Sequence, residues 1–144
     1  MIIGGSSSKM LAQDLASGNL PVFAFVTPNL IHDMHDGTVA DGDSWLASNL
    51  PTIFSSQAYQ NGTVAVFVTW DEGEGGNASN CAVNTSDVGC HVATLVVSPS
   101  TAPGTQSGNL YNHWSLLSTA EQLLHLPALG QAAGAPNMAP SFIL

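Results

Sequence analysis

The feature that most constrains this chain is the stretch TVAVFVTWDEGEGG, residues 63–76. An unbroken apolar and β-branched run ends at Trp70 and passes directly into Asp71 and Glu72, with glycines beyond them. Such a run is typical of a strand buried on both faces, as in the parallel sheets of α/β proteins. Ligands in these folds bind beyond the carboxyl ends of the strands. Because paired carboxylates suit a hard metal ion, we predict that Asp71 and Glu72 form the centre of a site.

The order of elements before this stretch predicts a βαβ crossover. We expect a helix over 8–17, a buried strand over 22–27, an acidic loop, and a helix that Asp43 caps and that Pro51 kinks or breaks. A crossover brings the ends of both strands to the same edge of a parallel sheet. The acidic loop and the Asp71–Glu72 pair are therefore expected to face one crevice.

The acidic loop, LIHDMHDGTVADGD, interleaves histidine with aspartate in a way that suggests ligand binding. Imidazole and carboxylate are the two ligand types for zinc, manganese or iron. The candidates are His32, Asp33, His35 and Asp36, whereas Asp41 and Asp43 are expected to serve the start of the following helix. The competing interpretation is a surface loop with capping aspartates.

A third buried strand is predicted over 92–98, followed by an amphipathic helix over 114–126 that Pro127 ends. His113 lies just before this helix, where it or Asn112 could act as a cap. A role for His113 in the site requires the strand over 92–98 to lie beside the strand over 22–27, and both interpretations stay open. His91 and His125 are interpreted as structural. The inward face of the helix is expected to comprise Leu116, Leu117, Ala120, Leu123 and Leu124.

The charge balance excludes several classes of partner. Lys9 is the one basic side chain among Lys and Arg, against ten Asp and Glu, and the formal net charge is -9. This balance repels nucleic acid and anionic membrane surfaces. No Arg can clamp a phosphate, so an anionic substrate must be held by metal, histidine, hydroxyl or backbone N–H groups. The 144 residues are expected to form a single domain, with no run approaching the roughly 18 to 20 apolar residues of a membrane helix.

Cys81 and Cys90 lie in a polar, Asn-rich loop, where a local disulfide is the favoured interpretation. A disulfide indicates an oxidising compartment, so we expect a secreted or periplasmic protein. The start of the chain nevertheless lacks the basic and apolar pattern of a signal peptide. A zinc site that uses both cysteines and His91 is the alternative, and it lacks an obvious fourth ligand.

Four segments of the chain form a recognisable series: PVFAFVTPNLIHDMHDGTVADGDSWL, VFVTWDEGEGG, CHVATLVVSPSTAPGT and YNHWSLLSTAEQLL. Together, and in this order, they resemble the carboxyl-terminal half of the bacterial phosphoesterase family. That family contains acid phosphatases and phospholipase C-type enzymes and belongs to the alkaline phosphatase superfamily. The resemblance implies a three-layer α/β/α fold with a mostly parallel, alkaline phosphatase-like sheet. It also implies that Asp71 and Glu72 bind a divalent metal ion, that His35 contacts phosphate or metal, and that His113 belongs to the catalytic site.

The chain departs from the family pattern at its amino end. Complete members carry a nucleophilic Ser or Thr and a Glu-Asn pair there, and this chain has no Glu-Asn step. The resemblance therefore implies a fold incomplete at the amino end. We expect either a homo-oligomer or an amino-terminal half supplied by another chain. We expect a metal-dependent phosphoric ester hydrolase, or the carboxyl-terminal portion of one. The alternative is a secreted, non-catalytic cation-binding module. A serine esterase that uses Ser98 is disfavoured, because no G-x-S-x-G motif surrounds that residue.

Overall fold

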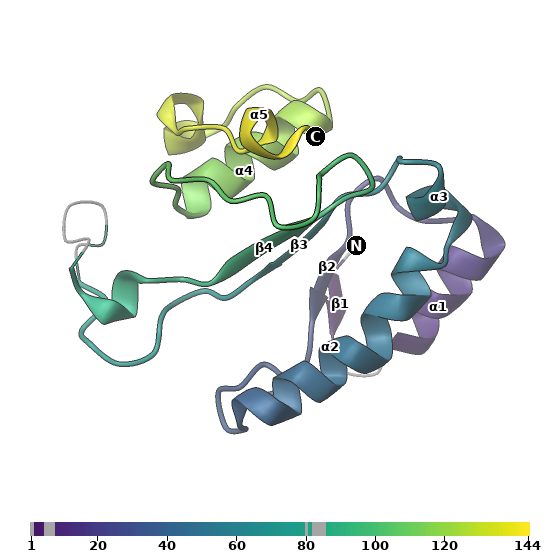
Figure 1. The fold of residues 1–144 in the computed structure, drawn as a ribbon, viewed down its shortest axis with the longest axis horizontal. Coiled ribbons are helices and arrows are strands. Elements are labelled where there is room, and N and C mark those ends of the chain that lie inside the picture. Colours follow the sequence, from purple (N-terminus) through teal and green to yellow (C-terminus); the bar gives the residue numbers. More distant parts are fainter. Residues whose placement is uncertain (1, 5–7, 80, 82–85) are drawn as a thin grey trace. The chain divides into compact units, whose positions relative to one another are not determined.

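The computed structural model describes residues 2–4, 8–79, 81 and 86–144 (Figure 1). The chain divides into two compact units, Met1–Val64 and Ala65–Leu144. Both mix helix and strand, so the α/β class is confirmed. The prediction of a single domain stays a prediction.

The first unit begins with a parallel crossover. Strand β1 (Ile2–Gly4) pairs in parallel with β2 (Phe25–Thr27), and α1 (Ser8–Ser17) connects them. The predicted helix over 8–17 is thus confirmed, and the chain leaves it through Gly18 at a φ of +71°. Strand β1 was not predicted, and β2 is shorter than the run over 22–27 that indicated it.

Helix α2 (Val39–Phe54) begins earlier than expected, and the prediction that Asp43 caps it is wrong. Thr38 is the N-cap residue. Its hydroxyl accepts a hydrogen bond from the backbone N–H of Asp41, while the Asp41 carboxylate accepts from the Thr38 backbone N–H at 2.8 Å. This reciprocal capping box satisfies two N–H groups at the helix start, which a cap at position 43 could not do.

The predicted break at Pro51 is also wrong, because Pro51 lies inside the continuous helix. It occupies the final turn and is exposed to solvent, so the loss of one backbone hydrogen bond affects only the end of the helix. A new cap, Ser56, then starts the short helix α3 (Gln57–Gln60), where its hydroxyl accepts from the Tyr59 N–H at 3.2 Å.

The second unit contains an antiparallel strand pair, β3 (Val66–Thr69) and β4 (Thr94–Val97). Thr69 lies opposite Thr94, and their hydroxyls are hydrogen-bonded at 2.9 Å. Among the described residues of the connection, the one regular element is the 3₁₀ turn η1 (Val88–Cys90), so no crossover helix is available to make this pair parallel. Of the two described pairs one is parallel, and the three-layer, mostly parallel sheet stays a prediction.

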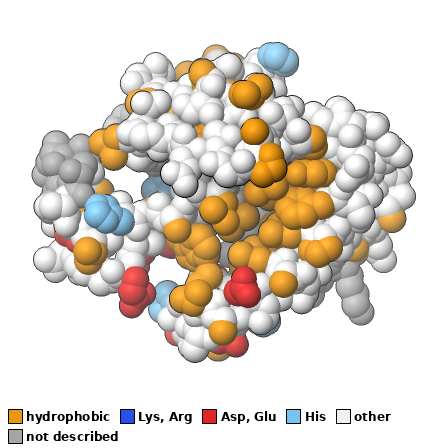
Figure 2. All heavy atoms as spheres, in the orientation of Figure 1, with side chains coloured by type: hydrophobic (Ala, Val, Ile, Leu, Met, Phe, Trp, Pro, Cys, Tyr) orange, Lys and Arg blue, Asp and Glu red, His pale blue; other side chains and the backbone are white. Residues whose placement is uncertain are grey.

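The strands are less buried than their apolar sequences predicted. All four residues of β3 are half-buried, and Phe25 of β2 and Leu95 of β4 are 54% and 56% exposed. The prediction of strands buried on both faces is therefore wrong for the described residues. Each of these strands lies in a two-stranded sheet, and a sheet of two strands shields little of either face. Figure 2 shows hydrophobic side chains exposed at several places on the visible face, among larger areas of other side chains and backbone.

The second unit ends in α4 (His113–Leu123), the 3₁₀ turn η2 (Gly130–Gly134) and α5 (Ala139–Phe142). Asn112 is the N-cap of α4, and its side chain accepts from the Ser115 N–H at 3.0 Å. The helix ends three residues before the predicted boundary at 126. His125 follows in the left-handed region, with a φ of +55°. Such a residue terminates a helix as glycine often does.

The buried face of α4 is polar, contrary to the prediction that its leucines form the inward face. Ser115, Thr119 and Glu121 are buried, whereas Leu116, Leu117, Ala120, Leu123 and Leu124 are half-buried. The carboxyl-terminal segment packs on this face through its backbone. Thr119 Oγ1 accepts from the N–H of Met138 at 2.8 Å and donates to the Ser115 carbonyl at 2.7 Å. Ala132, Met138 and Ala139 complete a small core beside these hydroxyls.

Candidate functional site

Asp71 and Glu72 lie just beyond the end of β3, separated from Thr69 by Trp70, close to where the sequence predicted the strand end. Both side chains are exposed to solvent. Because β3 and β4 are antiparallel, the connection over 70–93 starts and finishes at the same end of this pair. The carboxylates therefore lie at the start of this loop, where their exposure makes them accessible to a ligand.

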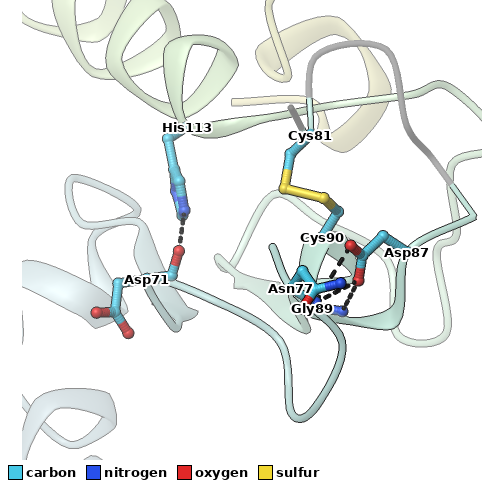
Figure 3. Close-up of a disulfide and its surroundings, with 7 residues drawn as sticks. All are labelled: Asp71, Asn77, Cys81, Asp87, Gly89, Cys90 and His113. Carbon is cyan, nitrogen blue, oxygen red and sulfur yellow. Dashed lines mark hydrogen bonds between the residues drawn. A yellow bond between two sulfur atoms is a disulfide. The ribbon is translucent and has the colours of Figure 1, made fainter. Parts of the chain in front are cut away.

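His113 contacts this strand end from α4. Its Nε2 lies 2.7 Å from the backbone carbonyl oxygen of Asp71. Figure 3 shows the imidazole directed at that carbonyl, while the Asp71 carboxylate points away from the ring. Since a carbonyl oxygen only accepts hydrogen bonds, Nε2 must carry the proton. His113 thus anchors the backbone at the first residue of the carboxylate pair.

This contact bears on the two interpretations of residues 112 and 113. Asn112 caps α4, and His113, the first helical residue, reaches the strand end instead. The sequence argument required the strand over 92–98 to lie beside the strand over 22–27. In the structure β4 pairs with β3, and His113 reaches Asp71 within the second unit. The catalytic role of His113 stays a prediction.

The loop after Glu72 is held by a turn that sequence reasoning missed. Cys81 and Cys90 form a disulfide, as predicted, and Asp87 lies three residues before Cys90 (Figure 3). The Asp87 carboxylate accepts from the backbone N–H groups of Gly89 at 3.0 Å and Asn77 at 3.3 Å. The D-x-G spacing at 87–89 is typical of such a turn and could have indicated it. With both thiols in the disulfide, the zinc alternative is wrong.

His35 belongs to the first unit, on the compact loop before α2. Its backbone N–H donates to Asp33 Oδ1 at 2.9 Å, and its Nδ1 lies 3.1 Å from Asp36 Oδ1. Both side chains of the His35–Asp36 pair are exposed, 72% and 56% respectively. Met34 adopts a φ of +76°. Its side chain packs closely against Gly42 on α2, in the space that a Cβ atom would otherwise occupy. Whether His35 reaches the Asp71–Glu72 pair stays a prediction.

The second unit offers oxygen ligands, which hard cations prefer, but these form only part of a complete ligand set. Within the part of the chain that the structure describes, no three His, Cys, Asp or Glu side chains are grouped closely enough to hold a metal ion. Asp71 and Glu72 nevertheless provide carboxylate oxygens at one exposed strand end. Magnesium sites commonly use one or two carboxylates together with waters and substrate phosphate, so two such side chains suffice for a site of that kind.

Residues 3–127 match the model of the phosphoesterase family. The chain belongs to the phosphoesterase family. It is 39% identical over 117 residues to a phosphatidylinositol-3-phosphatase of Mycobacterium tuberculosis, an alignment that covers 81% of this chain and 34% of that protein. It is 30% identical to an acid phosphatase of Aspergillus fumigatus and 30% identical to a probable acid phosphatase of Kluyveromyces lactis. These two alignments cover 82% and 87% of the chain, but only 25% and 28% of the relatives.

The chain thus spans about a third or less of each of these relatives. No solved structure matches it significantly. In the described part of this phosphoesterase family member, every helix is too short or too polar to cross a bilayer.

Proposed function

We propose that this chain acts in phosphoric ester hydrolysis with a divalent metal ion, as a hydrolase or as the carboxyl-terminal portion of one. The observation that carries the proposal is the pair Asp71–Glu72 at the end of β3, with its backbone anchored by His113 from α4. Membership of the phosphoesterase family supports the reaction class, as do relatives named as phosphatases.

In this proposal Asp71 and Glu72 bind the metal ion. When bound, a divalent ion polarises a phosphoryl oxygen and neutralises negative charge on the phosphate. The chain carries no Arg, so its own hydrogen-bond donors must assist in holding phosphate. We assign to His35 hydrogen bonds to phosphate oxygens or protonation of the leaving group. His113, with its proton on Nε2, keeps the first residue of the pair in place.

The substrate class that this proposal assigns is a phosphate ester, whose phosphate group is anionic. The relatives' names cover both a phosphoinositide and general acid phosphatase substrates, and the exposed pair is compatible with either. The strongly acidic chain repels anionic ligands unless a cation intervenes, which is a further reason to assign one to the site. The disulfide supports a secreted or periplasmic location.

Hydrolysis of p-nitrophenyl phosphate tests the proposal. The protein is assayed with and without EDTA, then as Asp71→Ala, and Asp14→Ala on α1 serves as a control that removes the same charge outside the site. We expect EDTA and Asp71→Ala to abolish turnover and Asp14→Ala to leave it unchanged. Turnover that is indifferent to both EDTA and Asp71→Ala would refute the metal-dependent mechanism.

The alternative function is a non-catalytic cation-binding module on the same scaffold. It is favoured by the excess of ten acids over one basic residue and by the solvent exposure of the carboxylate pair. Calorimetric titration with Mg²⁺ or Mn²⁺ distinguishes the two functions. Metal binding that Asp71→Ala removes, without turnover of mono- or diesters at high protein concentration, favours the binding module over a complete hydrolase.

A further inference from the structure

Asp87 is a half-buried carboxylate that joins two segments of the loop beyond the carboxylate pair. Its Oδ1 accepts from the Gly89 N–H at 3.0 Å, within its own turn. Both of its oxygens lie 3.3 Å from the N–H of Asn77, ten residues earlier in the chain. The bond to Gly89 has an ordinary length, and the two longer contacts share the single N–H of Asn77, so Asp87 joins these segments through one ordinary and one shared hydrogen bond.

The fit around Asp87 depends on glycines. Gly76 has a φ of +67°, and a Cβ placed there would clash with Asp87 Oδ1. Gly89 is buried, and a Cβ on it would approach the Gly75 carbonyl oxygen to 2.6 Å and the Ala78 nitrogen to 2.8 Å. The turn over 75–78 and the turn over 87–90 are therefore packed backbone against backbone, with the carboxylate between them.

This link extends to the residue next to Glu72. The carbonyl oxygen of Gly89, whose N–H is held by Asp87, accepts from the N–H of Gly73 at 2.9 Å. On its other side the pair is anchored by the hydrogen bond of His113 to the Asp71 carbonyl. The backbone of the carboxylate pair is thus held at both ends, by α4 before Glu72 and by the Asp87 turn after it.

We propose that Asp87 is a positioning residue for the Asp71–Glu72 pair, acting through Gly89 and Gly73 rather than by touching the bound ion. The inference rests on the proposed function in one respect, namely that the pair binds a divalent metal. Residues outside the ligand set that orient the ligands typically change metal affinity by about 10- to 100-fold when they are replaced. The Asp87 carboxylate is hydrogen-bonded to both turns, so we expect its loss to loosen the Gly73 end of the pair.

The test compares the full chain with Asp87→Ala, Asp87→Asn and Glu74→Gln. Glu74→Gln is the matched control, because it removes one negative charge from the same loop, closer in sequence to the pair than Asp87. Mn²⁺ affinity is measured from the electron paramagnetic resonance signal of the free ion. Protection of the Gly73 amide is measured by hydrogen exchange in metal-free protein, which reports the proposed linkage without any ion.

We expect Asp87→Ala to weaken Mn²⁺ binding about tenfold or more and to lower Gly73 protection by a similar factor. Asp87→Asn retains an oxygen that can accept from Gly89, so it should restore part of both. Glu74→Gln should leave Gly73 protection unchanged, and any effect it has on Mn²⁺ binding should be smaller than that of Asp87→Ala.

Two results would overturn the inference. One is unchanged Gly73 protection in Asp87→Ala, whether or not the wild-type protein binds Mn²⁺. The other is Mn²⁺ affinity that Asp87→Ala lowers no more than Glu74→Gln does, which would assign the effect to charge alone. Failure of the wild-type chain to bind Mn²⁺ would instead contradict the proposed function, and hydrogen exchange would still decide the linkage.

Discussion

Replacement of Gly73 by alanine tests how closely the loop after Glu72 is packed. A Cβ at this position would clash with the carbonyl oxygen of Val88 and lie 2.6 Å from that of His91. Both obstacles are backbone atoms, so no side-chain rotation relieves them. Gly73 also donates its N–H to the Gly89 carbonyl, so the loop cannot move outward without stretching that hydrogen bond.

We expect Gly73→Ala to lower the free energy of unfolding by about 1 to 3 kcal/mol, the usual cost of forcing an extra carbon into a packed site. Loss of the Gly73–Gly89 hydrogen bond adds about 1 kcal/mol, and the reduced entropy of the unfolded chain offsets a similar amount. Urea denaturation followed by tryptophan fluorescence measures the change. Gly108→Ala is the control, because a Cβ there meets nothing within 4 Å and the backbone is outside the left-handed region.

The control should be neutral or more stable than the wild-type protein by up to about 1 kcal/mol. If Gly73→Ala proves as stable as Gly108→Ala, the backbone packing described here between the segment after Glu72 and the Asp87 turn is wrong.

Three further predictions concern stability. Thr119→Val should lower the free energy of unfolding, measured by urea denaturation, by about 1 to 3 kcal/mol, because the buried N–H of Met138 loses its acceptor. Thr119→Ser should lower it less, and a Val variant of wild-type stability would contradict this prediction. The hydroxyl and backbone N–H of Thr38 lower the pKa of Asp41. The stability that Asp41 contributes is therefore fully present above its ordinary pKa of about 4 and is lost as the pH falls through its lowered pKa. The difference in thermal midpoint between wild type and Asp41→Asn should accordingly shrink from pH 6 towards pH 2, and a difference independent of pH would oppose it. Reduction by a dithiol should destabilise the second unit by about 2 to 3 kcal/mol in the chain-entropy model, and an unchanged urea midpoint would show that the disulfide contributes nothing.

The elements that the sequence predicted well are those whose local pattern matches their surroundings. The helix over 8–17 and the disulfide follow from apolar spacing, a following glycine and the Asn-rich context of the cysteines. The position of the β3 end, just before Asp71, was equally clear, because the change from β-branched residues to acids and glycines is abrupt. Local chemistry alone is sufficient to locate such boundaries.

Other features depend on competition between residues that local patterns do not resolve. Thr38 and Asp43 are both good N-cap residues, and the reciprocal bonds between Thr38 and Asp41 favour the earlier start. The prediction of the inward face of α4 was wrong because the leucines dominate any count of hydrophobic residues along the helix, whereas the buried hydroxyl residues Ser115 and Thr119 do not contribute to it. The observed choice depends on Met138, whose backbone N–H requires a buried acceptor and comes from a segment without periodicity.

The candidate site shows the same division. The acids at 71 and 72 indicated a site because they follow a strand end, whereas both a capping role and a site role stayed open for His113. The contact between His113 and the backbone of Asp71, rather than its carboxylate, was beyond sequence reasoning, because it depends on the direction of α4. Asp87 was missed because a single acid in a polar loop looks solvated, and its partners are backbone N–H groups that a sequence does not display.

The most direct test of the central claim is anomalous diffraction from crystals of the chain grown with Mn²⁺. We predict an anomalous peak about 2.0 to 2.6 Å from carboxylate oxygens of both Asp71 and Glu72, the range of oxygen distances for magnesium and calcium. A saturating Mn²⁺ concentration that leaves both carboxylates without a peak, or that places the ion on other side chains only, would contradict the proposal that this strand end is the metal site.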